Sequence, residues 1–210
     1  MTAAFYFDLA SPDAYIAAER VLGELPGPAA WTPVLAHELG EGTDTRGEDA
    51  ASREAIEQRA RELGLQQLRW PDPFPFDSTY AMRVATYARQ IGRVVAFTQA
   101  AFRQAFAGGR SLADEDSVLI AAAACEMHPS AVLRGAGLRS VIAELEQATA
   151  QARAGGVTAV PAVLVPGGGE EGGPAVFHGE ASLAAAAACM QSLGAGAEQN
   201  RAGGRSGAGP

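Results

Sequence analysis

The amino-acid sequence carries short apolar segments near both ends, and these segments have the pattern of β-strands. One is aromatic (4–9, AFYFDL), one contains Pro33 (30–35, AWTPVL), and two more follow at 157–165 (VTAVPAVLV) and 175–178 (AVFH). Short apolar runs rich in β-branched and aromatic residues predict buried strands. A proline inside such a run indicates an edge strand or an early end. The Gly- and Glu-rich turn between the last two runs predicts a hairpin.

A helix is predicted directly after the first strand. Ser11 is a preferred N-cap residue, and Pro12 suits the first helical position. The carboxylate of Asp13 suits the positive end of the helix dipole. Tyr15 opens a series of apolar residues at helical spacing, and the helix ends at the Pro-Gly-Pro sequence that begins with Pro26.

The middle of the chain has helical periodicity almost throughout. Further helices are predicted at 52–63, 79–107, 111–127, from Pro129 onward, at 140–154 and at 181–193. The polar segment 40–51 has the composition of a loop, and 70–76 (WPDPFPF) contains three prolines, so it is not helical throughout. The tail 194–210 is rich in Gly and Ala and has no core-forming residue, which predicts disorder.

This order of elements predicts an α/β protein. Strand–helix–strand at the start and strand–strand–helix at the end complete each other as one four-stranded mixed sheet. Residues 1–40 and 155–193 then form one discontinuous domain, 41–154 form an inserted all-helical domain, and 194–210 form a disordered tail.

Composition narrows the class of protein. The chain has 210 residues, of which 48% are hydrophobic and 19% charged, as in globular domains. Its net charge of −8 repels phosphate backbones, so nucleic acid is not an expected partner. No apolar run approaches the roughly 20 residues that a membrane span needs. The N-terminal segment lacks the basic residues of a secretory or transit signal. We therefore expect a cytoplasmic protein with no membrane partner.

The reactive side chains exclude several kinds of site. All 16 basic residues are arginine, which rules out a Schiff-base lysine and a phosphate-loop lysine. Cys125 and Cys189 lie far apart, with no CxxC pair and no Cys/His cluster, so no metal site is expected. The two thiols are either structural groups on buried helix faces or a reactive pair. We expect the first, without a disulfide.

Four segments together resemble one known family. FYFDLASPDAY (5–15) is similar to the opening of bacterial 2-hydroxychromene-2-carboxylate isomerases and kappa-class glutathione transferases. These proteins belong to the DsbA-like branch of the thioredoxin superfamily. GVTAVPAVLV (156–165) resembles the cis-proline loop of that branch, and VFHGEASL (176–183) resembles its closing motif. The segments 77–88 (DSTYAMRVATYA) and 101–119 (AFRQAFAGGRSLADEDSVL) resemble its insertion domain. The resemblance covers residues 3–193 and implies a thioredoxin-like fold with a large all-helical insertion.

The resemblance also implies a thiol site. Ser11 corresponds to the residue whose hydroxyl faces the sulfur of a bound thiol cofactor, glutathione or another low-molecular-weight thiol. Independently, a helix N-terminus lowers the pKa of a thiol through its amide donors and dipole, although Ser11 can also be a simple N-cap. Val160 and a cis Pro161 would face Ser11 across a cleft and pair with the cofactor backbone; a trans proline at a strand start is the alternative.

This chain departs from the family pattern at three places. Asp13 stands where a tyrosine is usual, and its carboxylate would raise the pKa of a nearby thiol. Ala181 and Ser182 replace the Asp-Arg pair that holds the γ-glutamyl end of the cofactor, which leaves Glu180 and Ser182 as partial substitutes. The segment 35–38 (LAHE) stands where the family has an asparagine-bearing loop.

An aromatic group completes the candidate site. Trp70, Phe74 and Phe76, with Tyr80 and with Pro12 at the helix start, either line an apolar substrate pocket or belong to the core. We expect a thiol-dependent isomerase or transferase whose small-molecule substrate is an unsaturated aromatic-derived acid. The alternatives are a DsbA-family oxidoreductase homologue that lacks CxxC, and a non-catalytic binding protein. A homodimer is left open.

Overall fold

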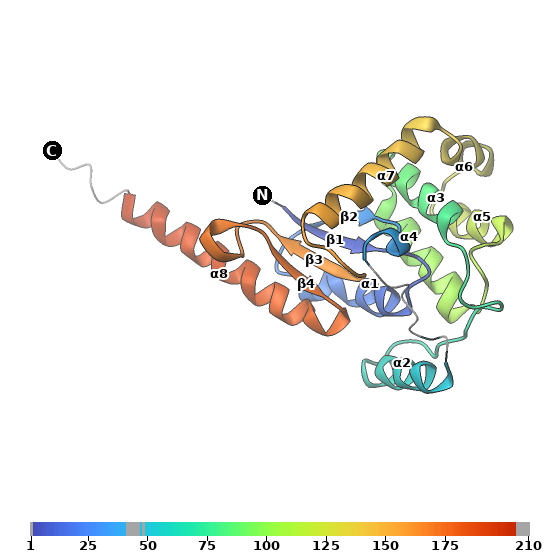
Figure 1. Cartoon of the computed structure of the whole chain (residues 1–210), viewed down its shortest axis with the longest axis horizontal. Helices are drawn as coiled ribbons and strands as arrows, with labels where there is room; N and C mark the ends of the chain where they lie inside the picture. The colour runs from blue at the N-terminus through green and yellow to red at the C-terminus, as the bar shows by residue number, and fades with distance from the viewer. Residues whose placement is uncertain (1, 41–46, 48, 205–210) are drawn as a thin grey trace.

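The computed structural model describes residues 2–40, 47 and 49–204 (Figure 1). Its centre is one four-stranded sheet in the order β2-β1-β3-β4. The strands are β1 (Ala3–Phe7), β2 (Ala29–Pro33), β3 (Ala162–Val165) and β4 (Ala175–His178). β1 and β2 are parallel, and the other pairs are antiparallel. The predicted mixed sheet from both chain ends and the predicted hairpin are therefore confirmed.

The strands alternate between two covered faces. Phe5 and Phe7 are fully buried on one face, and Tyr6 between them packs on the opposite face. Phe5 lies opposite Trp31 of β2 and Val163 of β3, so the central strand is buried on both sides. β2 is an edge strand in this sheet and ends at Pro33, as the proline predicts.

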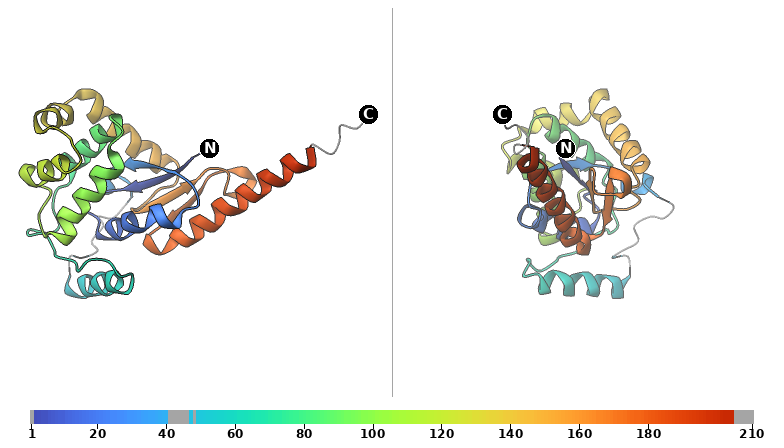
Figure 2. Two further views of the ribbon diagram at one scale, coloured as in Figure 1. Left: turned by 180° about the vertical axis from the view of Figure 1, so that it is seen from behind. Right: turned by 90° about the vertical axis from the view of Figure 1, so that its left-hand side faces the viewer.

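Helices surround the sheet unequally. They are α1 (Pro12–Glu24), α2 (Ala50–Glu62), α3 (Thr79–Gln90), α4 (Val94–Phe102), α5 (Glu115–Ala123), α6 (Pro129–Ala136), α7 (Arg139–Ala154) and α8 (Leu183–Gly204). Shorter turns are η1 (Ala36–Glu38), a π-helical turn η2 (Arg103–Ala107), η3 (Glu170–Gly172) and η4 (Glu180–Ser182). α1 and α8 cover one face and α7 the other, while α3–α6 pack at one end of the sheet (Figures 1 and 2).

The helix expected over 79–107 is wrong in its length. It is divided at Gly92, whose φ of 72° lies in the left-handed region that favours glycine. The amides of Gly92 and Arg93 donate to the carbonyls of Arg89 and Ala88, which closes α3. The chain then restarts as α4 at a new angle.

Three other predicted boundaries also differ. α5 begins only at Glu115, because the carboxylate of Asp114 accepts the amide of Ser117 and caps the helix there. α7 begins one residue before its expected cap. Residues 194–204, expected to be disordered, continue α8, in keeping with the high helix propensity of the Ala, Glu and Gln residues in that stretch. Residues 205–210 of the tail and most of the expected loop at 40–51 lie outside the described residues.

One continuous apolar core joins the sheet, α1 and the helical block. Phe7 of β1 lies 6.1 Å from Phe102 of α4, and Tyr15 of α1 stacks on Phe106 at 5.7 Å between ring centroids. A smaller cluster fills the space between the sheet and α7 and includes Val160. The helices between β2 and β3 therefore share a core with the sheet and α1, and the position of α1 depends on both the sheet and these helices.

A pair of glycines provides a packing test of this arrangement. A Cβ added at Gly135 in α6 would stand 2.5 Å from the Tyr87 ring of α3, whereas one at Gly23 in α1 meets nothing within 4 Å. We expect Gly135→Ala to destabilise the fold by about 1–3 kcal/mol through overpacking. Gly23→Ala should stabilise it by about 0.5–1 kcal/mol through helix propensity. Urea unfolding measures both, and equal effects of the two changes would contradict the α3–α6 packing.

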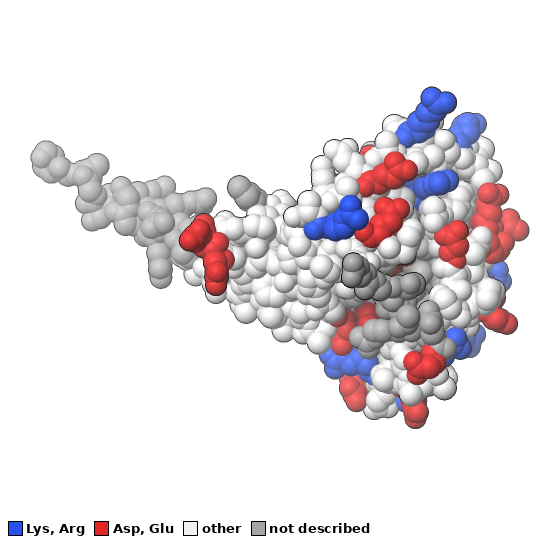
Figure 3. Space-filling model, in the orientation of Figure 1, with Lys and Arg blue, Asp and Glu red and all other residues white. Residues whose placement is uncertain are grey.

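The charged surface is mixed in sign. On the face shown in Figure 3, acidic and basic side chains intermingle over the helical block. A broad uncharged area covers the strands of the hairpin and the adjoining part of α8, and acidic side chains stand at the hairpin turn. Among the residues that the structure describes, no helix combines the length and apolar character that crossing a membrane requires.

Candidate functional site

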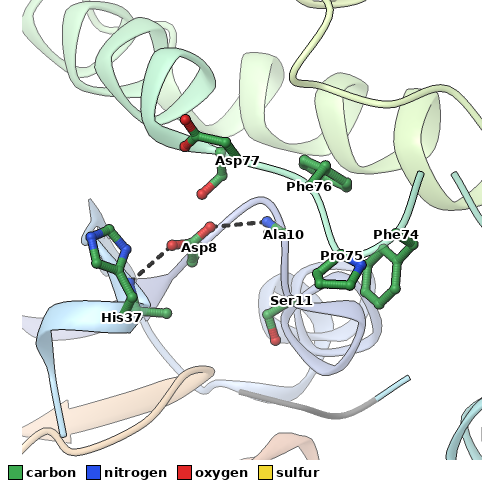
Figure 4. A pocket seen from close by; sticks show the side chains of 10 residues that line it. Asp8, Ala10, Ser11, His37, Phe74, Pro75, Phe76 and Asp77 are labelled. Atoms are coloured by element: carbon green, nitrogen blue, oxygen red, sulfur yellow. Dashed lines mark hydrogen bonds between the residues drawn. The ribbon is translucent and has the colours of Figure 1, made fainter. Parts of the chain in front are cut away.

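A cavity of about 120 Å³ opens where β1 leads into α1 (Figure 4). Its lining comes from the β1–α1 turn, from the start of η1, and from the segment that precedes α3. The lining residues are Asp8, Ala10, Ser11, Ala36, His37, Phe74, Pro75, Phe76, Asp77 and Ser78. The predicted Ser11, Phe74 and Phe76 thus meet at one cavity.

Ser11 is the N-cap of α1, as its sequence context predicts. Its backbone is extended (φ −87°, ψ 117°), and its Oγ accepts the amide of Ala14 at 3.2 Å. The side chain is buried, yet it lines the cavity. A serine hydroxyl that accepts one bond still has its O–H to donate. Ser11 is therefore both a helix cap and a donor available to a ligand at the positive end of α1.

Asp8 is the main feature of the site that the sequence analysis missed. Its carboxyl is 2% exposed, and its two oxygens accept the amides of Ala10 and Ala36, each at 2.9 Å. The side chain of Ser78 also interacts with this carboxyl. Burial raises the pKa of Asp8, while these hydrogen bonds and the nearby His37 act to lower it. An aspartate directly after a buried aromatic strand was the available sequence signal.

The other polar groups of the cavity are more exposed. His37, on η1, is 57% exposed and comes from the segment that stands in place of the family's asparagine-bearing loop. Asp77 accepts the amide of Thr79 at 2.8 Å, and hydrogen bonds with Thr79 hold the pKa of Asp77 below its usual value. Asp8, His37 and Asp77 are the ionisable side chains among the described lining residues.

The aromatic group divides between cavity and core. Phe74 and Phe76 line the cavity with Pro75 between them, although Phe76 is also a core residue. Trp70 does not line it: its ring stands 5.1 Å from Phe74, and its Nε1 donates to Glu57 of α2 at 2.7 Å. Phe74 and Phe76 therefore line a cavity and Trp70 does not; that this cavity takes a substrate stays a prediction.

The other two predicted pocket residues, Tyr80 and Pro12, do not line the cavity, and neither does Asp13. Tyr80 packs against the core, Pro12 is buried at the first position of α1, and Asp13 is buried in its first turn. The aromatic part of the cavity lining is thus Phe74 and Phe76, with Pro75 between them.

The Val160–Pro161 peptide bond is cis, as predicted. These two residues lead directly into β3, whose Ala162 pairs with Tyr6 of β1. The register therefore puts them at the end of the sheet where β1 continues toward Ser11. Val160 is buried in the cluster against α7, and neither residue lines the cavity. That Val160 faces Ser11 stays a prediction.

Glu180 and Ser182 lie outside the cavity and have partners within the protein. The carboxylate of Glu180 forms ion pairs with Arg20 of α1 and with Arg59 of α2, the latter at 2.6 Å. The hydroxyl of Ser182 donates to the carbonyl of Gly179 at 2.8 Å. Glu180 therefore links three segments that are far apart in sequence, whatever else it contacts.

Replacement of Glu180 by glutamine should destabilise the fold. The carboxylate is 11% exposed, and each of its two oxygens pairs with a guanidinium group. The amide of glutamine has a single oxygen, so it can accept from only one of the two arginines. We expect a loss of about 1–2 kcal/mol in urea unfolding, between the values for exposed and fully buried pairs. Glu144→Gln is the control, since Glu144 pairs with Arg89 and Gln90 at the surface and should change stability by less than about 0.5 kcal/mol. Equal effects would contradict the linking role of Glu180.

The two cysteines are free thiols, as expected. Both are half-buried rather than fully buried, and Cys125 lies in the turn after α5 instead of on a helix face, because α5 ends at Ala123. Burial raises the pKa of the Cys125 thiol. Within 2–40, 47 and 49–204, no group of three or more His, Cys, Asp or Glu side chains is placed to hold a metal ion.

Comparison with known families gives a match over most of the chain. The family described as the DSBA-like thioredoxin domain matches residues 36–191. No curated protein sequence gives a significant match.

Solved structures with this arrangement include enzymes of two kinds. A 2-hydroxychromene-2-carboxylate isomerase is 17% identical, with a TM-score of 0.77 over 96% of this chain and 98% of its own. A probable DsbA oxidoreductase from Streptomyces coelicolor is 18% identical, with a TM-score of 0.72 over 91% and 90%. The cytosolic disulfide reductase DsbM of Pseudomonas aeruginosa, solved with GSH, is 17% identical, with a TM-score of 0.62 over 94% and 100%. At this level of identity the similarity shows a shared fold.

Proposed function

Because the chain belongs to the DsbA-like thioredoxin family, we propose that it is a thiol-dependent isomerase or transferase that uses Ser11 to hold the cofactor sulfur. One observation carries the proposal. The N-terminal end of α1, where a thiolate is best stabilised, presents Ser11 to a cavity that Phe74, Pro75 and Phe76 also line. The thiol must then come from a small molecule, because Cys125 and Cys189 are elsewhere in the fold.

The chemistry that such a site supports is reversible addition. The sulfur of the bound thiolate attacks one carbon of a conjugated double bond, a C–S bond forms, and the π-electron pair moves onto the conjugated carbonyl oxygen. The former double bond is now single and rotates. Return of the electron pair expels the thiolate and restores the double bond in the other geometry, so atoms and electrons balance without an oxidant. The protein contributes orientation and stabilisation of the thiolate.

The lining residues suit a flat, conjugated substrate. Phe74, Pro75 and Phe76 offer an apolar surface close to Ser11 (Figure 4). The family resemblance implies an unsaturated aromatic-derived acid as substrate. Among the described lining residues, His37 is the group that can carry a positive charge toward the carboxylate of such an acid.

The cofactor that we propose is glutathione or a similar low-molecular-weight thiol, without a metal. The fold that this chain shares with a disulfide reductase solved with GSH supports this choice. In this proposal the cofactor backbone lies along the cis-proline segment at Val160 and Pro161, and Glu180 and Ser182 are candidate contacts for its far end. A cytoplasmic location, where such thiols stay reduced, fits this chemistry.

Thermal unfolding with added thiols tests the proposal. Glutathione at 100 times its dissociation constant should stabilise the protein by about 2.7 kcal/mol, whereas S-free analogues of equal charge should stabilise it less. The rate of insulin reduction with the protein present should equal the rate with the thiol in the buffer alone. Insulin reduction above that rate would instead indicate an oxidoreductase, and no stabilisation by glutathione or cysteine would indicate a binding protein without a thiol cofactor.

A further inference from the structure

The buried carboxyl of Asp8 connects the three segments that form the cavity. Its Oδ1 accepts the amide of Ala10 in the β1–α1 turn, and its Oδ2 accepts the amide of Ala36 at the start of η1. The carboxyl also interacts with the side chain of Ser78, the residue before α3. Ala10, Ala36 and Ser78 all line the cavity (Figure 4). One side chain therefore joins all three walls.

Asp8 also holds Ser11 through its main chain. The amide of Ser11 donates to the carbonyl of Asp8 at 3.0 Å, and Ala10, which the carboxyl binds, immediately precedes Ser11. The turn that sets the position of the Ser11 hydroxyl is thus fixed at both of its ends by one residue. Hydrogen bonds from buried amides to a carboxylate are among the stronger ones in proteins.

A second carboxyl in the same cavity lacks this arrangement. Asp77 bonds only with Thr79, two residues further along its own segment, among the hydrogen bonds between described residues. Asp77 therefore lines the cavity but forms no hydrogen bond to another segment of the lining among the described residues. Asp8 and Asp77 therefore form a matched pair for substitution. The side chains are of the same type, but only that of Asp8 bonds to other segments of the cavity lining.

We propose that Asp8 is a positioning residue that holds the β1–α1 turn, η1 and the start of α3 in one arrangement, so that the hydroxyl of Ser11 is fixed for a thiol ligand. Both oxygens of Asp8 are occupied by protein donors, so it acts through Ser11 rather than on the ligand. The inference rests on the proposed function for the identity of the ligand. The three-way connection itself does not depend on the ligand.

Three substitutions separate this positioning role from general destabilisation and from an effect of charge in the cavity: Asp8→Asn, Ser78→Ala and Asp77→Asn. In Asp8→Asn one of the two backbone amides faces an amide N–H₂ instead of an oxygen. Ser78→Ala removes only the third link, and it leaves the α3 cap unchanged because the Ser78 side chain makes no cap hydrogen bond. Asp77→Asn removes a cavity charge without touching the connection. Each variant is measured by hydrogen exchange at the amides of Ala10 and Ala36, by calorimetric glutathione binding, and by the ultraviolet absorbance of bound thiolate.

We expect Asp8→Asn to speed exchange at Ala10 and Ala36 selectively, and to raise the dissociation constant of glutathione by about tenfold or more, as loss of one charged hydrogen bond implies. Thiolate absorbance at saturation should fall. Ser78→Ala should change the same three readouts in the same direction by less, which keeps the test valid if Asp8→Asn does not fold. Asp77→Asn should leave the exchange rates of the Ala10 and Ala36 amides as in the parent, because Asp77 bonds to neither of them. A parent-like Asp8→Asn, or equal effects of Asp8→Asn and Asp77→Asn, would overturn the positioning role.

The two proposals fail in different ways. If the parent protein does not bind glutathione, the proposed function is wrong, and the exchange rates alone decide the role of Asp8. Selective loss of protection at Ala10 and Ala36 then supports the three-way connection. A uniform increase of exchange over the whole chain overturns it, because that result is what a merely destabilising substitution produces.

Discussion

Replacement of Ser11 by alanine should slow the thiol-dependent reaction by about one to two orders of magnitude, because the loss of a donor to a charged sulfur removes about 1.5–3 kcal/mol. The Ser11 hydroxyl lines the cavity at the N-terminus of α1 and accepts the amide of Ala14. The alanine variant also loses this cap, which should lower the free energy of unfolding by about 0.5–2 kcal/mol. Turnover is measured against pH with a conjugated carbonyl compound in excess as the electrophile. Its pH dependence reports the pKa of the bound thiol, and this pKa should rise in the variant.

Ser11→Asn separates the cap from the donor. Asparagine caps helices about as well as serine, but it places an amide rather than a hydroxyl near the sulfur. Stability should therefore recover in this variant, while turnover should recover only in part. If alanine and asparagine variants both turn over like the parent, Ser11 is only a helix cap.

Phe102→Ala should have the largest effect on stability, about 3–5 kcal/mol, which is the range for truncation of a buried phenylalanine. The Phe102 ring is fully buried and stands 6.1 Å from both Phe7 of β1 and Tyr15 of α1. It therefore joins the helical block to the sheet and to the helix that carries Ser11. Urea unfolding, monitored by circular dichroism, measures the loss.

Two further variants check the interpretation of Phe102. Phe102→Leu keeps most of the volume and should cost less than about 1.5 kcal/mol. Leu133→Ala, at a 42% exposed position of α6, should leave stability within about 0.5 kcal/mol. A loss below 1 kcal/mol for Phe102→Ala would mean that the block and the sheet do not depend on a shared core.

The elements around Ser11 could be predicted because their signals are local. The aromatic strand, the Ser-Pro-Asp sequence and the apolar run after Pro161 each act within a few residues, and the structure has β1, α1 and β3 where they indicate. The break at Gly92 was also visible locally. The preceding periodicity continues across it, however, and this outweighed a single glycine.

The connections made by single side chains could not be predicted in this way. Asp8 binds the amide of Ala36, 28 positions away, and backbone amides carry no sequence signal of their own. Glu180 pairs with Arg59 across 121 positions, which only the folded chain brings together. Sequence reasoning therefore located Ser11 and part of the aromatic wall, but it missed the residue that holds them in place.

The pKa of the glutathione thiol bound to the protein tests the central claim most directly. It is measured from the ultraviolet absorbance of the thiolate against pH, for the parent and for Ser11→Ala. The account predicts a bound pKa below that of the free thiol, because the amides and dipole of α1 and the Ser11 hydroxyl stabilise the anion, and a higher value in Ser11→Ala. A bound thiol that titrates at or above the value of free glutathione, and equally in both proteins, would contradict it.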